Sequence, residues 1–137
     1  MEAAAANGLC EALILIVEDE ILIALDIKST LVDAGAEVIG PATTLRSATP
    51  IALSEPLSAA TLDVQLGRET TDAIAAILSE RDIPFLFYTG QALPRDMRAR
   101  WPQSPVIIKP ASQNAIVAAM AELLGRHRAA KSIPGAR

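Results

Sequence analysis

The stretch LILIVEDE, residues 13–20, carries five apolar side chains directly into three carboxylates. An apolar run of this length predicts a buried strand. The three acids that follow it repel one another, and an apolar neighbourhood raises the free energy of ionising them. Something else in the folded protein must therefore offset the charge of Glu18, Asp19 and Glu20.

Five short apolar runs recur along the chain, each followed by a helix-like segment or by a loop that leads to one. Runs that are apolar on both faces are typical of parallel strands covered above and below by helices. Strand and helix alternating five times predict right-handed crossovers and an open α/β sheet. The five expected strands are residues 12–17, 37–39, 59–62, 84–88 and 106–108.

Two helices are marked by apolar residues three or four positions apart. In the first, Ile23, Ile27 and Leu31 form one stripe, and Gly35 is expected to end the helix. Ser112 is expected to cap the last helix, whose stripe consists of Ile116, Met120, Leu123 and Leu124.

The remaining helices are less regular. Thr43 or Thr44 is expected to begin one that Pro50 kinks or shortens, because proline removes a backbone donor. The segment 93–103, with a proline near each end, allows at most a short helix. Thr71 is expected to cap another helix, which buries Ile74, Ile77 and Leu78.

Composition excludes several kinds of site. Cys10 is the only cysteine, so no disulfide framework or thiolate metal cluster is expected, and the single histidine, His127, removes Ser–His and Cys–His catalysis. The net charge of −4 argues against nucleic acid as a partner. No segment reads as a signal peptide or a membrane span, so we expect a cytoplasmic protein without a membrane partner.

The expected organisation is one domain over residues 12–127, with an N-terminal tail over 1–11 and a C-terminal tail over 128–137. A chain of 137 residues can bury one core of ordinary size.

Polar residues follow four of the five predicted strands at the point where each strand ends. The carboxyl ends of parallel strands form one edge of a sheet, where ligands bind. Carboxylates gathered there suit Mg²⁺, which in turn can hold phosphoryl oxygens, and one Asp can act as a nucleophile. The residues concerned are Glu18, Asp19 and Glu20 after the first strand, Asp63 after the third, Thr89 after the fourth and Lys109 after the fifth.

At the motifs LIVEDE, LDVQL, YTG and IIKP the sequence resembles the receiver domain of two-component response regulators, over roughly residues 12–125. The resemblance implies a flavodoxin-like (βα)5 fold, a doubly wound parallel sheet with strand order 2-1-3-4-5. It also implies that Asp63 is the phosphoacceptor, that Thr89 is the switch hydroxyl and that Lys109 pairs with the phosphoryl group. A cis peptide bond before Pro110 is implied as well.

The same resemblance implies a Mg²⁺ cofactor. Asp19 would be a direct ligand and Glu18 would act through water. Asp63 and the backbone carbonyl of Gln65 would complete the protein ligands.

The sequence looks closest to the single-domain subfamily nicknamed FAT GUY, but it departs from the usual receiver pattern at three positions. Val106 stands where many receivers have an aromatic switch residue, which leaves the output mechanism open. Tyr88 stands where the subfamily has alanine, and Gly67 where many receivers have proline. No departure removes a group that phosphorylation needs.

The function implied is that of a single-domain response regulator. Asp63 would take a phosphoryl group from a histidine kinase, HWE-type or related, or from a histidine phosphotransfer protein. Signalling would then pass to an unknown downstream protein by contact, or the chain would drain phosphate from a kinase. It is not expected to be a conventional turnover enzyme.

Three other functions fit parts of this pattern. A phosphorylation-independent, receiver-like adaptor stays open, although the set of acids, hydroxyl and amine argues against it. A small Mg²⁺-dependent phosphohydrolase usually has a second acid two residues after the nucleophile, where this chain has Gln65. A flavodoxin-type cofactor carrier is rejected, because carboxylates after the first strand would repel a phosphate.

Overall fold

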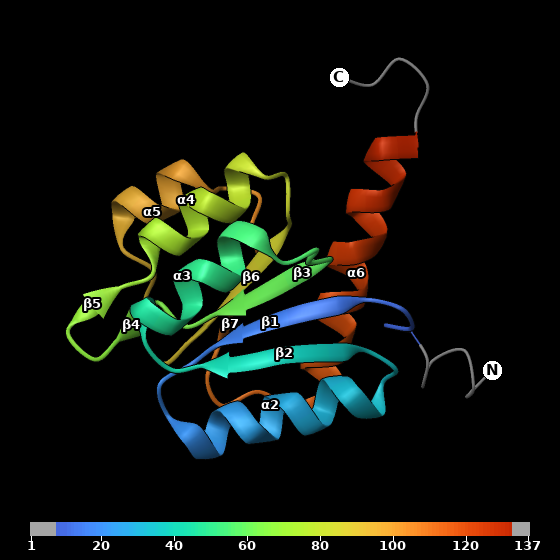
Figure 1. Ribbon diagram of the computed structural model, residues 1–137, viewed down its shortest axis with the longest axis horizontal. Coiled ribbons are helices and arrows are strands. Elements are labelled where there is room, and N and C mark those ends of the chain that lie inside the picture. Colours follow the sequence, from blue (N-terminus) through green and yellow to red (C-terminus); the bar gives the residue numbers. More distant parts are fainter. Residues whose placement is uncertain (1–7, 133–137) are drawn as a thin grey trace.

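The computed structural model describes residues 8–132 (Figure 1). Its central feature is a five-stranded parallel sheet, with a separate two-stranded hairpin beside it. The elements in chain order are β1 (Leu13–Val17), α2 (Ile21–Asp33), β2 (Glu37–Ala42), α3 (Leu45–Ser54), β3 (Ala59–Leu62), β4 (Gln65–Leu66), β5 (Glu69–Thr70), α4 (Asp72–Glu80), β6 (Phe85–Thr89), α5 (Arg95–Arg100), β7 (Val106–Ile108) and α6 (Gln113–Ser132).

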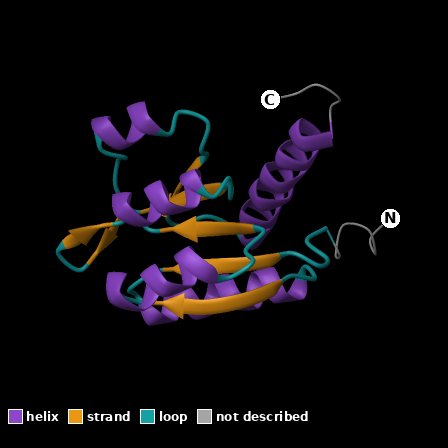
Figure 2. Ribbon diagram, turned by 45° about the horizontal axis from the view of Figure 1, so that its top comes forward, coloured by secondary structure: helices purple, strands orange, loops and turns teal. Residues whose placement is uncertain are grey.

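The strand order of the main sheet is β2-β1-β3-β6-β7, and all four neighbouring pairs are parallel. Because β4 and β5 belong to the hairpin, this order is 2-1-3-4-5 for the parallel strands, as the resemblance to receiver domains implied. Helices cover both faces of the sheet (Figures 1 and 2). One core lies between the sheet and α3, α4 and α5, and a second lies between the sheet and α2 and α6.

The predicted helices are present, with two corrections at α4. Thr71 precedes α4, but its hydroxyl does not cap the helix. Ile77 is only partly buried, whereas Ala75 is fully buried, so the buried stripe lies slightly to one side of the predicted one.

The other helix starts agree with the sequence. Thr44 caps α3 in a reciprocal pair of hydrogen bonds with Ser47, and Pro50 lies inside this ten-residue helix. The side-chain oxygen of Ser112 accepts a hydrogen bond from the amide of Ala115 in the first turn of α6.

The β4–β5 hairpin was not predicted. Each strand has only two residues, too few for a periodic pattern, and Gly67 turns between them with φ +60°. The cis peptide bond expected at Lys109–Pro110 is present.

Residues on both sides of the range 12–127 belong to the described structure. Leu9 is completely buried and α6 continues to Ser132. The domain limits of 12–127 stay a prediction. Within residues 8–132, no helix combines the length and the apolar character needed to cross a bilayer.

A bulge in β2 determines where β1 leaves the sheet. Leu15 pairs with Ile39 and Val17 pairs with Ala42, so two residues of β2 lie opposite one residue of β1. Gly40, one of the two, has φ +99°, and a Cβ there would lie 2.8 Å from the amide nitrogen of Ala42. Just beyond the bulge, the amide of Glu18 donates to the carbonyl of Ala42 at 3.0 Å.

Replacing Gly40 tests the importance of this bulge. We expect Gly40→Ala to lower the free energy of unfolding by about 1–3 kcal/mol, because the side chain both strains the backbone and meets β2 itself. Urea unfolding followed by circular dichroism measures the change.

The matched control is Gly125→Ala. Gly125 lies within α6, and no atom lies within 4 Å of its would-be Cβ. The free energy of unfolding of this variant should rise by about 0.5–1 kcal/mol, since alanine favours a helix more than glycine does. Equal urea midpoints for the two variants would refute a contribution of the bulge to stability.

Candidate functional site

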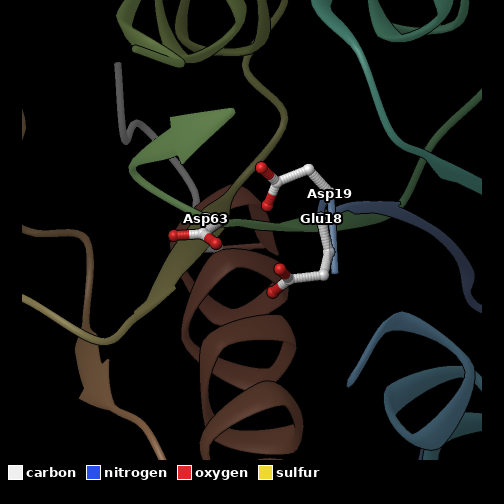
Figure 3. Close-up of side chains that lie close together, drawn as sticks. All are labelled: Glu18, Asp19 and Asp63. Atoms are coloured by element: carbon white, nitrogen blue, oxygen red, sulfur yellow. The ribbon is translucent and has the colours of Figure 1, made fainter. Parts of the chain in front are cut away.

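Three carboxylates meet at the carboxyl edge of the sheet. Glu18 and Asp19 follow β1, and Asp63 follows β3. One carboxylate oxygen from each lies within 4.8 Å of the others (Figure 3). Glu18 and Asp63 are buried, while Asp19 is exposed. The convergence predicted from the ends of the strands is therefore present for all three acids.

The ammonium group of Lys109, just after β7, joins these acids. Its Nζ atom lies 2.7 Å from a carboxylate oxygen of Glu18 and 2.9 Å from Oδ2 of Asp63. Glu20 lies further away, at 3.6 Å, and is largely exposed. Together with Asp19, four carboxylates thus gather near one ammonium, so the site keeps an excess of negative charge.

The sheet register places Glu18 and Asp63 side by side. Val17 pairs with Leu62, so the two acids leave adjacent strands at the same level. The amide of Asp63 donates to the carbonyl of Val17 at 2.9 Å. The buried hydroxyl of Thr71 does not cap α4 and instead donates to the carbonyl of Asp63 at 2.6 Å.

Asp19 is held by the hairpin that the sequence did not reveal. Its Oδ2 atom accepts a hydrogen bond of 2.9 Å from the amide of Gly67, in the β4–β5 turn. The turn therefore orients the exposed acid toward Asp63. A side chain at Gly67 would meet no atom within 4 Å, so its left-handed backbone, not crowding, favours glycine there.

Thr89 and Gln65 line the same small cavity, of about 210 Å³, together with Glu20, Asp63, Gly90, Gln91 and Lys109. Thr89 is completely buried, and its hydroxyl oxygen accepts from the amide of Gln91 at 3.2 Å. The side chain of Gln91 donates to the side-chain oxygen of Gln65 at 2.8 Å. This bridge closes one side of the cavity.

Burial dominates the electrostatics of Glu18, whose exposed fraction is 1%. Loss of water raises its pKa to about 7, and the negative charge of Asp63 adds to this effect. Hydrogen bonds from Lys109 and from the amide of Glu20 oppose the shift without cancelling it. Burial alone would lower the pKa of Lys109, but hydrogen bonds to Glu18 and Asp63 outweigh it and hold this pKa above its usual range.

The donor set suits a hard divalent cation. Mg²⁺ prefers a few carboxylates together with carbonyl oxygens and water. Three clustered carboxylates with the ammonium of Lys109 beside them fit that preference, since they carry more negative charge than one ammonium can offset.

Sequence reasoning brought the right acids and the lysine to one edge, but it missed three contributors. These are the Thr71 hydroxyl below Asp63, the Gln91 side chain across the cavity, and the Tyr88 ring near Lys109. Each acts across different elements of the fold. No local pattern around these residues signals the contact.

Comparison with solved structures identifies the architecture. The response regulator PhyR from Brucella abortus is 27% identical, with a TM-score of 0.76 over 95% of this chain. The chain spans about half of that protein, 55% of its length. A receiver domain protein (CheY-like) from Methanospirillum hungatei is 21% identical with a TM-score of 0.78, and the match covers 86% of this chain and 97% of that one.

The chain has the CheY-like receiver fold. A receiver domain of HemR from Leptospira biflexa supports this, with 25% identity and a TM-score of 0.73 over 83% of this chain and 94% of that one. No protein-family model matches the sequence, and the search of curated proteins found no match either. The acidic pocket formed by Glu18, Asp19 and Asp63 is typical of the receiver phosphoacceptor site.

The raised pKa of Glu18 predicts a pH-dependent stability in metal-free buffer. Its pKa is about 7 in the folded protein against 4.5 for a free side chain, so the proton favours the folded state. This contribution is complete below pH 4.5 and disappears as the pH rises through 7. Over that window the free energy of unfolding of the wild type should fall by about 3 kcal/mol relative to that of Glu18→Gln.

Urea unfolding at several pH values, with chelator present, measures this difference. Glu37→Gln, which changes an exposed carboxylate on β2, should follow the wild type throughout. If the difference in free energy of unfolding between wild type and Glu18→Gln stays constant from pH 4.5 to 7, Glu18 does not have the raised pKa described above.

Proposed function

We propose that Asp63 accepts a phosphoryl group from a phosphohistidine, supplied by a histidine kinase, HWE-type or related, or by a histidine phosphotransfer protein. The observation that carries this proposal is the meeting of three carboxylate oxygens within 4.8 Å, with Lys109 bonded to Asp63. An Asp carboxylate is a known covalent acceptor of phosphate.

The transfer forms one oxygen–phosphorus bond on Asp63 and breaks the nitrogen–phosphorus bond of the donor, whose imidazole leaves and takes up a proton. Lys109 already contacts Asp63, so its ammonium is placed to neutralise a phosphoryl oxygen there. Thr89 lines the same cavity, and its hydroxyl would donate to a second phosphoryl oxygen.

Mg²⁺ is the cofactor in this proposal. Asp19 and Asp63 would hold it directly, Glu18 through water, and the backbone carbonyl of Gln65 would be the third protein ligand. When bound, the cation supplies positive charge for the phosphoryl oxygens. The hydrogen bond from Gly67 keeps Asp19 turned toward the cluster, which is the orientation that such a ligand needs.

The phosphorylated state would be read by another protein, or the chain would drain phosphate from a kinase. Val106, at the position of the usual aromatic switch residue, is 41% exposed and is not aromatic, so the output mechanism stays open in this proposal. Residues 12–127 would form the functional unit, and a cytoplasmic location is part of the proposal.

Treatment with acetyl phosphate and Mg²⁺, followed by intact mass spectrometry, tests the proposal. We expect the wild type to gain one phosphoryl group and Asp63→Asn to gain none, because the amide is not a nucleophile. Asp33→Asn, which alters an exposed acid at the end of α2, is the matched control and should behave as wild type.

The outcomes distinguish the competing functions. A wild type that gains no phosphoryl group would favour a phosphorylation-independent adaptor. Continuous release of phosphate from unrelated esters would favour a phosphohydrolase. Equal labelling of wild type and Asp63→Asn would place the acceptor elsewhere.

Mg²⁺ binding provides a separate prediction. Replacing Asp19 by Asn removes one charged ligand, so affinity measured by titration calorimetry should fall at least about tenfold, as it does when the surroundings of other metal sites are altered. Asp33→Asn again serves as the control. Unchanged affinity in Asp19→Asn would exclude the acid as a direct ligand.

A further inference from the structure

Tyr88 lies directly before Thr89 in β6 and faces the other side of the sheet. Neighbouring residues of a strand point to opposite faces. Thr89 lines the acidic cavity, whereas Tyr88 belongs to the core shared with α2 and α6 and is 7% exposed. Two neighbouring residues of β6 therefore lie on different sides of the sheet, one in the cavity and the other in the core.

The Tyr88 side chain makes two polar contacts in that core. The Nζ atom of Lys109 lies 5.6 Å from the centre of its ring, within the distance at which an aromatic face attracts a cation. The phenol oxygen accepts a hydrogen bond of 3.2 Å from the amide of Ala111. Tyr88 thus contacts residues on either side of Pro110.

The backbone explains why Ala111 is the partner. The amide of Lys109 already donates to the carbonyl of Thr89 at 2.8 Å, and Pro110 has no amide proton. Ala111 is therefore the first residue after the strand whose amide is free to bond a side chain. Ser112, the next residue, caps α6.

We propose that Tyr88 is a positioning residue, whose ring holds the Lys109 ammonium beside Asp63 and whose hydroxyl binds Ala111, in the loop that leads from β7 into α6. This inference rests on the proposed function. It gives the chain a route to its surface that does not use Val106. A shift of Thr89 or Lys109 toward a phosphoryl group pulls on Tyr88, and through it on Ala111 and the start of α6. The surface that responds is the β7–α6 loop, which leads directly into α6.

Two substitutions separate the two contacts. Tyr88→Phe keeps the ring and removes the hydrogen-bond acceptor, while Tyr88→Leu removes both and keeps an apolar side chain. Phe87→Leu is the matched control, because Phe87 is a buried aromatic of the same strand that packs on the opposite face, against Trp101. Phe87→Leu should lower the free energy of unfolding about as much as Tyr88→Leu does, but it should leave the position of the Lys109 ammonium unchanged.

Two measurements use the unphosphorylated protein. Amide hydrogen exchange at Ala111 should be about fivefold faster in Tyr88→Phe than in wild type, and unchanged in Phe87→Leu. Nuclear Overhauser contacts between the Tyr88 ring and the Lys109 side chain should be present in wild type, and the phenyl ring of the Tyr88→Phe variant should retain them. Unaltered exchange overturns the tie to α6, and absent Overhauser contacts overturn the placement of Lys109.

A third measurement concerns the reaction. The rate of labelling by acetyl phosphate should fall about two- to fivefold in Tyr88→Leu, and Tyr88→Phe should restore it to near the wild-type rate. Equal rates in Tyr88→Leu and wild type would overturn the positioning role. If the wild type is not labelled, the proposed phosphotransfer fails, while the exchange and Overhauser measurements still decide the two contacts.

Discussion

The contact of Lys109 with Glu18 and Asp63 is the interaction on which the site depends. It joins the ends of β1, β3 and β7, three segments that are far apart along the chain. Burying a carboxylate without a partner destabilises the folded state. Removing one charged group of such a cluster therefore leaves the charge of the others without a partner. The parallel sheet makes the contact possible, since it brings the carboxyl ends of its strands to one edge.

The same arrangement leaves the site short of positive charge. Acidic groups outnumber the ammonium, and burial together with the nearby charge of Asp63 raises the pKa of Glu18 to about 7, although Lys109 opposes this shift. A protein selected for stability alone would replace such a cluster, whereas sites that bind cations or transfer charged groups keep perturbed carboxylates. The negative excess is thus an electrostatic reason for a cation to enter, and a bound cation would in turn offset the negative charge of a phosphoryl group.

Strand β6 connects this edge to the rest of the molecule. Its odd-numbered residues pack in one core and its even-numbered residues in the other. Phe87 packs with Trp101 near α5, while Leu86 packs with residues of α2 and α6. At its end, Thr89 enters the cavity and Tyr88 enters the core below it. The residues at the end of β6 therefore contact both faces of the sheet, the cavity through Thr89 and the core through Tyr88.

The sequence by itself determined the parallel sheet, its flanking helices and the acids and lysine at its edge, because apolar runs and the residues that end them are local patterns. Asp63 and Lys109 were predicted to meet for that reason alone. Only the tertiary structure decided the Gly40 bulge, the hairpin that orients Asp19, the Thr71 bond to Asp63 and the Tyr88 contacts. Each of these contacts depends on the strand register or on the packing between elements that are distant in the chain. Neither the register nor the packing can be predicted from the sequence of one segment alone.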